Sequence, residues 1–283
     1  MSSKITLIEC PRDAMQGFHH QFSTQEKIKY IQLLDNVGFD YLDCASFVSS
    51  KSIPQMADSK AVLNGLKETK TKLLSIVANE RGALMAAETD QISVLGYPFS
   101  ISETFQLRNT KKSIDESLVL IEKIKSITDN HNKDLVIYLS MAFGNPYHEK
   151  WNMELINLQV ANLANLGVNV ISLSDTIGVA NSKDIKEIFI QLISNHPKII
   201  FGAHLHCKPL EWEEKLNAAF DGGCLRFDGA MMGFGGCPMA TDSLTGNMPT
   251  EHIVQKFRKQ LKSKFIEKNF TKALFAAGQL FNI

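Results

Sequence analysis

Two histidines separated by one residue, His204-Leu205-His206, are the strongest local signal for chemistry in the sequence. Successive side chains of an extended segment point to opposite sides, so both imidazoles face the same way. Two imidazoles beside a carboxylate suit a divalent cation. An isolated His-x-His segment is more often a chance pattern or a strand cap. Asp13 follows another strand-like segment and supplies a carboxylate, which favours a metal site.

Other charged residues also stand at the ends of apolar, strand-like segments. Arg12 precedes Asp13, and its permanently charged planar fork suits a carboxylate or a developing enolate oxygen. Asp43 ends a second such segment, and Asp175 follows a sixth. Two simpler interpretations stay open at this point. Arg12-Asp13 is then a surface ion pair, and Asp43 and Asp175 are helix caps or loop-ordering groups.

A glycine-rich segment, residues 233–238, reads Gly-Phe-Gly-Gly-Cys-Pro. It is interpreted either as a tightly turned loop or as a mobile lid that brings Cys237 over the site. A cysteine between glycine and proline is not typical of a hydrophobic core, which favours the functional interpretation. The nearby Gly246-Asn247 is either a simple turn or the source of an amide carbonyl that completes a hard-cation site.

Eight short apolar runs, alternating with helical patterns, must position these residues. The expected strands are 5–9, 39–43, 72–77, 92–95, 135–139, 168–173, 199–203 and 224–228. Nearly continuous apolar runs are typical of parallel strands that are covered on both faces. Eight strand–helix units in 283 residues favour an α/β fold, a (β/α)8 TIM barrel, over the alternative of an open doubly wound sheet. Active sites of such barrels lie at the carboxyl ends of the strands, where the charged residues stand.

Helix signals support the same organisation. Ser23 and Glu26 form an expected capping box, and Gly38 is expected to close that helix. The sequence predicts a last helix from Thr250 to about Lys264 and a short terminal helix near 272–281, so a C-terminal helical extension follows the barrel. We expect residues 1–283 to form a single catalytic domain.

Charge and cysteine content exclude several classes of protein. Lys plus Arg and Asp plus Glu both number 30, so no net charge favours nucleic acid or a membrane surface as a partner. No run approaches the roughly 18 apolar residues of a membrane span. Five cysteines without a C-x-x-C spacing argue against a disulfide framework and a cysteine-only zinc site. Reduced thiols and the lack of a secretory-signal pattern lead us to expect a cytoplasmic protein.

Taken together, these motifs make the sequence similar to the hydroxymethylglutaryl-coenzyme A lyases, within the wider family of metal-dependent lyase and Claisen-condensing barrels. The resemblance runs nearly end to end. It rests on segments 9–16 (ECPRDAMQ), 46–49 (SFVS), 54–56 (PQM), 173–178 (LSDTIG), 202–206 (GAHLH), 235–238 (GGCP) and 246–247 (GN). Arg-Asp and His-x-His are shared by the wider family, whereas the SFVS segment, the loop cysteine and the Gly-Asn pair are more particular to the lyases.

The resemblance implies a set of site residues. A divalent metal, Mg or Mn, would be bound by Asp13, His204, His206 and Asn247. Arg12 would polarise the thioester carbonyl and stabilise an acetyl-coenzyme A enolate, and Cys237 would move a proton to or from that enolate. Four further residues would bind substrate or position ligands: Gln16, Asp43, Ser46 and Asp175.

The implied reaction is retro-Claisen cleavage of an acyl-coenzyme A. The substrate would be 3-hydroxy-3-methylglutaryl-coenzyme A and the products acetyl-coenzyme A and acetoacetate, as in leucine degradation and ketone-body metabolism. A base near the metal, Asp13 or a histidine such as His204, would accept the proton of the substrate hydroxyl. Family members are often dimers, so a homodimer is expected.

Departures from the family pattern and two rival functions stand beside this interpretation. Asp43 occupies a position where many members have Glu, and Cys207-Lys208 follows His206 where Asp-Thr or Thr-Thr is more usual. A related condensing acyltransferase or a small-molecule aldolase on the same barrel is the alternative. Condensing relatives usually carry a long C-terminal extension, which this sequence does not show after the eighth unit. A non-catalytic binding barrel would require a lost ligand or a lost arginine, and all are present.

Overall fold

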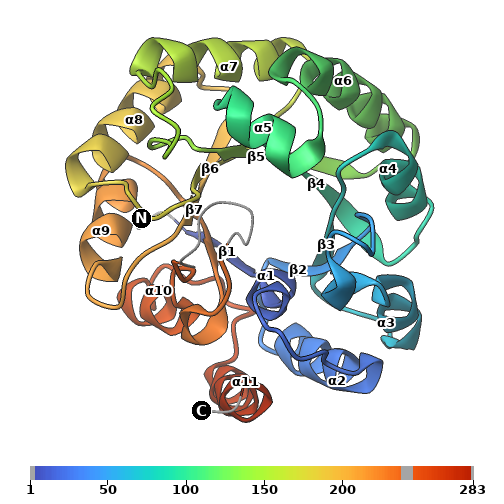
Figure 1. Cartoon of the computed structure of the whole chain (residues 1–283). Coiled ribbons are helices and arrows are strands. Elements are labelled where there is room, and N and C mark those ends of the chain that lie inside the picture. Colours follow the sequence, from blue (N-terminus) through green and yellow to red (C-terminus); the bar gives the residue numbers. More distant parts are fainter. Residues whose placement is uncertain (1–3, 237–244, 282–283) are drawn as a thin grey trace.

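Eight parallel strands close into a barrel in the computed structural model, which describes residues 4–236 and 245–281. The strands pair in sequence order, and β8 pairs with β1. Their bounds are β1 Thr6–Glu9, β2 Tyr41–Ser46, β3 Lys72–Ile76, β4 Ile92–Ser100, β5 Asp134–Ser140, β6 Val170–Asp175, β7 Ile200–Leu205 and β8 Arg226–Gly229. All eight predicted strands are present, and the predicted TIM barrel is confirmed (Figure 1).

The strands are buried on both faces because helices cover the outside and side chains fill the inside. β4 is longer than predicted, since Gly96 and Pro98 do not end it. β3 pairs with β4 only as far as Gly96, while β5 continues to pair up to Ser100. Beyond Gly96, β4 has no strand partner among the described residues on the β3 side. The missing N–H of Pro98 therefore removes no ladder hydrogen bond on that side.

Helices follow the strands around the barrel and form its outer layer (Figure 1). Their bounds are α2 Thr24–Asp35, α3 Ser59–Gly65, α4 Glu80–Ala87, α5 Glu103–Thr110, α6 Ile114–Asn130, α7 Met153–Asn165, α8 Ser182–Asn195 and α9 Trp212–Asp221. The Ser23–Glu26 capping box is present in full. Two 3-10 turns, η1 Pro54–Met56 and η2 Met231–Gly233, lie in loops.

Two helices, α10 Thr250–Lys256 and α11 Glu267–Leu280, form the predicted C-terminal extension. α10 is shorter than predicted because the chain turns back to contact the start of the barrel. Ile5 N donates to Gln260 O, and Lys262 Nζ lies 2.9 Å from Asp40 Oδ1. α11 packs on α2, outside the helical ring (Figure 1). Ile266 N donates to Val37 O beside this contact.

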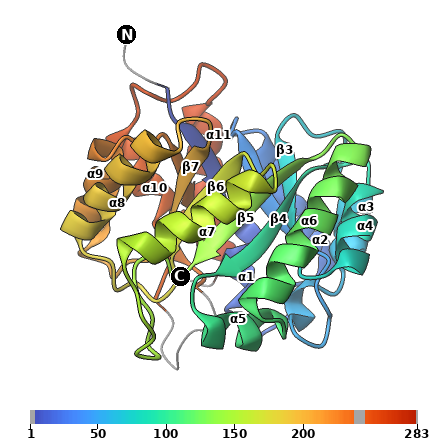
Figure 2. The ribbon, with the colours of Figure 1, turned by 90° about the horizontal axis from the view of Figure 1, so that it is seen from above.

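The short helix α1, Pro11–Gln16, begins directly after β1 and lies at the carboxyl end of the barrel. In the side view the chain starts at one end of the barrel and α5 lies at the other (Figure 2). No helix among the described residues is long and apolar enough to cross a membrane. The charged residues of α1 thus face the ends of the neighbouring strands, where the polar residues of β2, β6 and β7 collect.

Candidate metal centre and active site

Arg12 is the centre of a buried ion-pair network at the mouth of the barrel. Its Nε lies 3.1 Å from Asp43 Oδ1 and its Nη2 lies 2.5 Å from Asp43 Oδ2, so the pair is bidentate. Nη1 donates to Asp13 Oδ1 at 3.1 Å and to Gln16 Oε1 at 2.7 Å. Arg12 and Asp43 are both buried. The guanidinium is therefore fixed in one orientation and stays charged, because two carboxylates raise the pKa of Arg12 against the effect of burial.

Asp13, His204 and His206 come together although they are far apart in the sequence. His204 stands on β7, His206 follows β7, and Asp13 stands on α1. One ligand atom from each of the three lies within 4.8 Å of the others. Asn247 joins them, because its Nδ2 donates to Asp13 Oδ2 at 2.6 Å. An antiparallel bridge pairs Asn247 with His206 just beyond β7. The structure therefore brings together all four residues predicted as metal ligands.

Each histidine is oriented through its Nδ1 atom. His204 Nδ1 lies 3.1 Å from Asp228 Oδ2, and His206 Nδ1 lies 3.0 Å from the backbone oxygen of Thr176. Both partners are acceptors, so Nδ1 carries the proton and the lone pair of a neutral ring is left on Nε2. His206 Nε2 is buried and has no hydrogen-bond partner among the described residues. A bare imidazole nitrogen beside a carboxylate is what a divalent metal ion would bind, so these residues fit such an ion.

The electrostatics of Asp13 and His206 agree with this fit. Burial lowers the pKa of His204, but the hydrogen bond and the charge of Asp228 raise it by more. Burial raises the pKa of Asp13, but Arg12 and the two imidazoles lower it further, to about 2, so the carboxylate is ionised. Burial and the nearby His204 lower the pKa of His206 to about 4, which keeps its ring neutral. An ionised carboxylate and a neutral imidazole are the forms that bind metal ions.

A pocket opens above this centre. Arg12, Asp13, Gln16, His204 and His206 line its inner part. Its walls include apolar and basic side chains: Val48, Ile53, Ile76, Pro98, Phe105, Arg108, Lys111 and Tyr138. Charged and metal-type groups thus lie at the bottom of a partly apolar pocket, an arrangement typical of small-molecule sites.

Two predicted residues, Ser46 and Asp175, do not line this pocket. Ser46 is buried at the end of β2, where its Oγ accepts from Val48 N at 3.3 Å, and it does not line the pocket. The carboxylate of Asp175 points under the loop after β6 and accepts from Val179 N and Ala180 N. Cys237 lies outside the described residues. The predicted substrate contacts of Ser46 and Asp175 therefore stay predictions, as does the role of Cys237.

Several residues of the site were missed by sequence reasoning. Asp228 orients His204 from β8, and Thr176 orients His206 through its backbone. Lys215 on α9 forms an ion pair with Asp175 at 2.9 Å. A lysine on the buried face of α9, beside Leu216 and Ala219, was a local signal that could have revealed Lys215. Backbone contacts such as that of Thr176 leave no such signal.

Comparisons with known proteins identify the family of the chain. The sequence model of the HMGL-like family matches residues 5–274. The chain therefore belongs to the HMGL-like family. Hydroxymethylglutaryl-CoA lyase YngG of Bacillus subtilis is 32% identical over 253 residues, which cover 89% of this chain and 84% of that protein. A 3-hydroxy-3-isohexenylglutaryl-CoA/hydroxy-methylglutaryl-CoA lyase of Pseudomonas aeruginosa is 28% identical over 90% of this chain and 85% of its own length.

Solved structures of HMG-CoA lyases are also similar to this chain. The HMG-CoA lyase of Bacillus subtilis superposes with a TM-score of 0.91 at 28% identity, covering 98% of this chain and 93% of that one. An HMG-CoA lyase from Acinetobacter baumannii, in complex with coenzyme A and 3-methylmalate, superposes with a TM-score of 0.90 at 27% identity. That match covers 99% of this chain and 92% of the other.

Proposed function

We propose that this chain is a divalent-metal-dependent carbon–carbon lyase that cleaves 3-hydroxy-3-methylglutaryl-coenzyme A to acetyl-coenzyme A and acetoacetate. One observation carries the proposal: the Asp13, His204 and His206 cluster lies beside a fixed Arg12 at the mouth of a barrel. Curated relatives that are HMG-CoA lyases match this barrel over most of its length. On that basis we propose the substrate that appears in their names as the substrate of this chain.

The metal is proposed to be Mg²⁺ or Mn²⁺, held by Asp13, His204, His206 and Asn247. When bound, such an ion acts as a Lewis acid that acidifies a coordinated hydroxyl group. A mixed set of carboxylate, amide and imidazole groups suits both ions and also others, so the choice rests on the family resemblance. The proton acceptor for the substrate hydroxyl is one of the side chains at this centre, Asp13 or a histidine.

Arg12 is the group proposed to stabilise the enolate of acetyl-coenzyme A. Asp43 holds two of its nitrogens and Asp13 and Gln16 hold the third, so the guanidinium needs no reorientation as charge develops on the thioester oxygen. The apolar part of the pocket, formed in part by Val48 and Ile53, would keep water from the enolate. Cys237 is proposed to deliver the proton that completes the second product.

The outer pocket supports a coenzyme A substrate. Arg108 and Lys111, on and just after α5, line the pocket and bring two positive charges to it. Phosphate groups of coenzyme A would be attracted to such charges. The solved lyase that contains coenzyme A is similar to this chain over nearly its whole length. A homodimer is proposed from the family resemblance and is testable by sedimentation.

Product analysis tests the proposed function. Purified protein is treated with EDTA and incubated with 3-hydroxy-3-methylglutaryl-coenzyme A, with and without added Mg²⁺ or Mn²⁺. Acetoacetate and acetyl-coenzyme A in equal amounts, formed only with the metal, are expected. Full activity in metal-free protein would contradict the metal mechanism. Condensation of acetyl-coenzyme A with a 2-oxo acid, in the absence of cleavage, would instead support the rival acyltransferase.

A further inference from the structure

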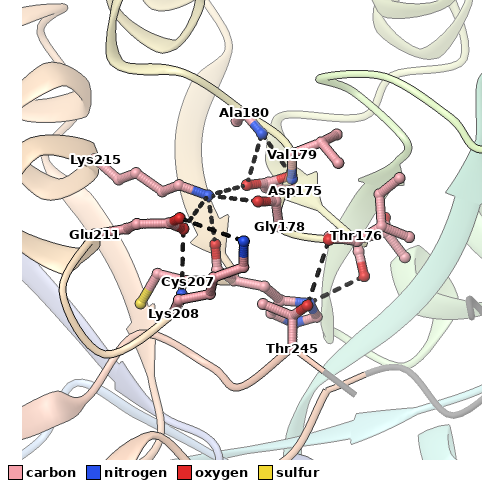
Figure 3. A network of polar contacts seen from close by, with 12 residues as sticks. Asp175, Thr176, Gly178, Val179, Ala180, Cys207, Lys208, Glu211, Lys215 and Thr245 are labelled. Atoms are coloured by element: carbon pink, nitrogen blue, oxygen red, sulfur yellow. Dashed lines mark hydrogen bonds and ion pairs between the residues drawn. The ribbon is translucent and has the colours of Figure 1, made fainter. Parts of the chain in front are cut away.

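We propose that Lys215 is a positioning residue that fixes His206 in the orientation required for metal binding, an inference that rests on the proposed metal centre. Lys215 is on α9 and is only 2% exposed. Its Nζ reaches inward to the loop that follows β6 and to the end of β7 (Figure 3). A lysine is rarely this buried unless its charge is paired.

Every N–H of the Lys215 ammonium has an acceptor. Nζ donates to Asp175 Oδ2, Gly178 O and His206 O, each at 2.9 Å. Glu211 Oε2 lies 3.7 Å away and adds a second negative charge. Asp175 ends β6, Gly178 lies in the loop that follows β6, and His206 is a predicted metal ligand. The ammonium therefore joins two neighbouring strand ends at a single point.

The same loop holds the side chain of His206. Thr176 O accepts from His206 Nδ1 at 3.0 Å, and Asp175 fixes the course of the loop by accepting from Val179 N and Ala180 N. Lys215 binds both that carboxylate and the backbone oxygen of His206. The ring and the backbone of His206 are thus fixed to one loop, and Lys215 closes the link between them.

The residues after His206 explain why this link is needed. Cys207 and Lys208 follow His206 directly. Cys207 Sγ makes only a long contact, 3.9 Å, with Asn247 O, and the side chain of Lys208 is exposed. Neither offers a carboxylate to hold the end of β7. Groups that orient a metal ligand typically change metal affinity 10- to 100-fold when they are removed.

The test measures Mn²⁺ binding to metal-free protein, from the electron paramagnetic resonance signal of free Mn²⁺, so that it does not depend on activity. Lys215→Met alone leaves the buried Asp175 carboxylate unpaired and endangers folding. The variant Lys215→Met with Asp175→Asn removes both charges together. Lys215→Gln with Asp175→Asn restores a hydrogen-bond donor of nearly the same length. Thermal melts with circular dichroism establish that each variant is folded.

The chain offers a matched control. Lys27 is likewise buried, and its Nζ lies 2.6 Å from Asp58 Oδ1 and also binds the backbone oxygen of Gln55. Among the described residues, no hydrogen bond or ion pair joins Lys27 or Asp58 to the metal-type residues. Lys27→Met with Asp58→Asn therefore removes another ion pair of a buried lysine, whose partner Asp58 is partly exposed. It is expected to lower the melting temperature and to leave the Mn²⁺ dissociation constant unchanged.

The Lys215→Met double variant is expected to raise the Mn²⁺ dissociation constant about 10- to 100-fold, and the Lys215→Gln double variant is expected to recover part of that loss. An unchanged dissociation constant in the folded Lys215→Met double variant would overturn the proposal. An equal loss of affinity in the Lys27 control would overturn it too, since the effect would then be general destabilisation. Wild-type protein that binds no Mn²⁺ would refute the metal centre itself, and the Lys215 proposal with it.

Discussion

Glu9 is a fully buried carboxyl group whose titration should govern the pH dependence of folding. It ends β1, and its two oxygens accept from Met231 N at 2.9 Å and from Thr250 Oγ1 at 2.5 Å. These contacts attach β1 to η2 and to the first residue of α10. Burial raises the pKa of Glu9 to about 8, against the smaller opposing effect of the two hydrogen bonds. The folded chain therefore keeps a proton that the unfolded chain releases near pH 4.5.

The sign and size of the effect follow from this difference in proton binding. The raised pKa gives stability that is fully present below pH 4.5 and is lost as the pH rises to about 8. Within that window the folded state binds one more proton, so the free energy of unfolding falls by about 1.4 kcal/mol per pH unit. The loss over the whole window is on the order of 5 kcal/mol.

Glu9→Gln removes this titration and keeps the shape of the side chain. Between pH 5.5 and 7.5 the free energy of unfolding of the variant should rise by about 3 kcal/mol relative to the wild type. Urea titrations of metal-free protein at several pH values, followed by tryptophan fluorescence, measure this difference. A difference between variant and wild type that is constant over the pH range would refute the reasoning, because Glu9 would then be ionised in both states.

Three further predictions concern the active site. Arg12→Met should lower kcat about a hundredfold or more with little change in KM, because the charge of Arg12 acts chiefly on the developing enolate. Steady-state kinetics measure both constants, and a change in KM alone would show that Arg12 is a binding group. Gly235→Ala should weaken Mn²⁺ binding, because φ is +101° there and a Cβ would lie 2.5 Å from Asn247 Nδ2; unchanged affinity would contradict that crowding. Cys237→Ser should lose most lyase activity and keep metal affinity, because a hydroxyl is a far weaker acid than a thiol; near-normal turnover in folded protein would exclude Cys237 from proton transfer.

The barrel could be predicted because its signals are local. Each strand is an apolar run with helical patterns on both sides, and the Ser23–Glu26 capping box is a contact over three residues. The predicted ends of two elements were wrong because contacts between residues far apart in the sequence determine where those elements end. β4 runs through Pro98 because β3 has already ended, and α10 stops at Lys256 because the following residues bind the start of the barrel.

The metal-type residues could be predicted, whereas the groups that hold them could not. The spacing of His204 and His206 indicates a metal site, and the carboxyl ends of the strands are where such side chains are expected to lie. Lys215 and its partner Asp175 are 40 residues apart, so no local pattern links a lysine on α9 to the end of β6. The contact between Thr176 and His206 uses a backbone oxygen, which every residue has, and so carries no sequence signal.

The closed barrel explains why the site needs contributions from so many elements. His204 is oriented by Asp228 of β8, His206 by the loop after β6, and Asp13 by Arg12 and Asn247. The ligands therefore keep their relative positions only as long as β6, β7, β8 and β1 remain paired in this order. A substitution that loosens one of these strand ends should change metal affinity before it unfolds the barrel, because local opening requires less free energy than global unfolding.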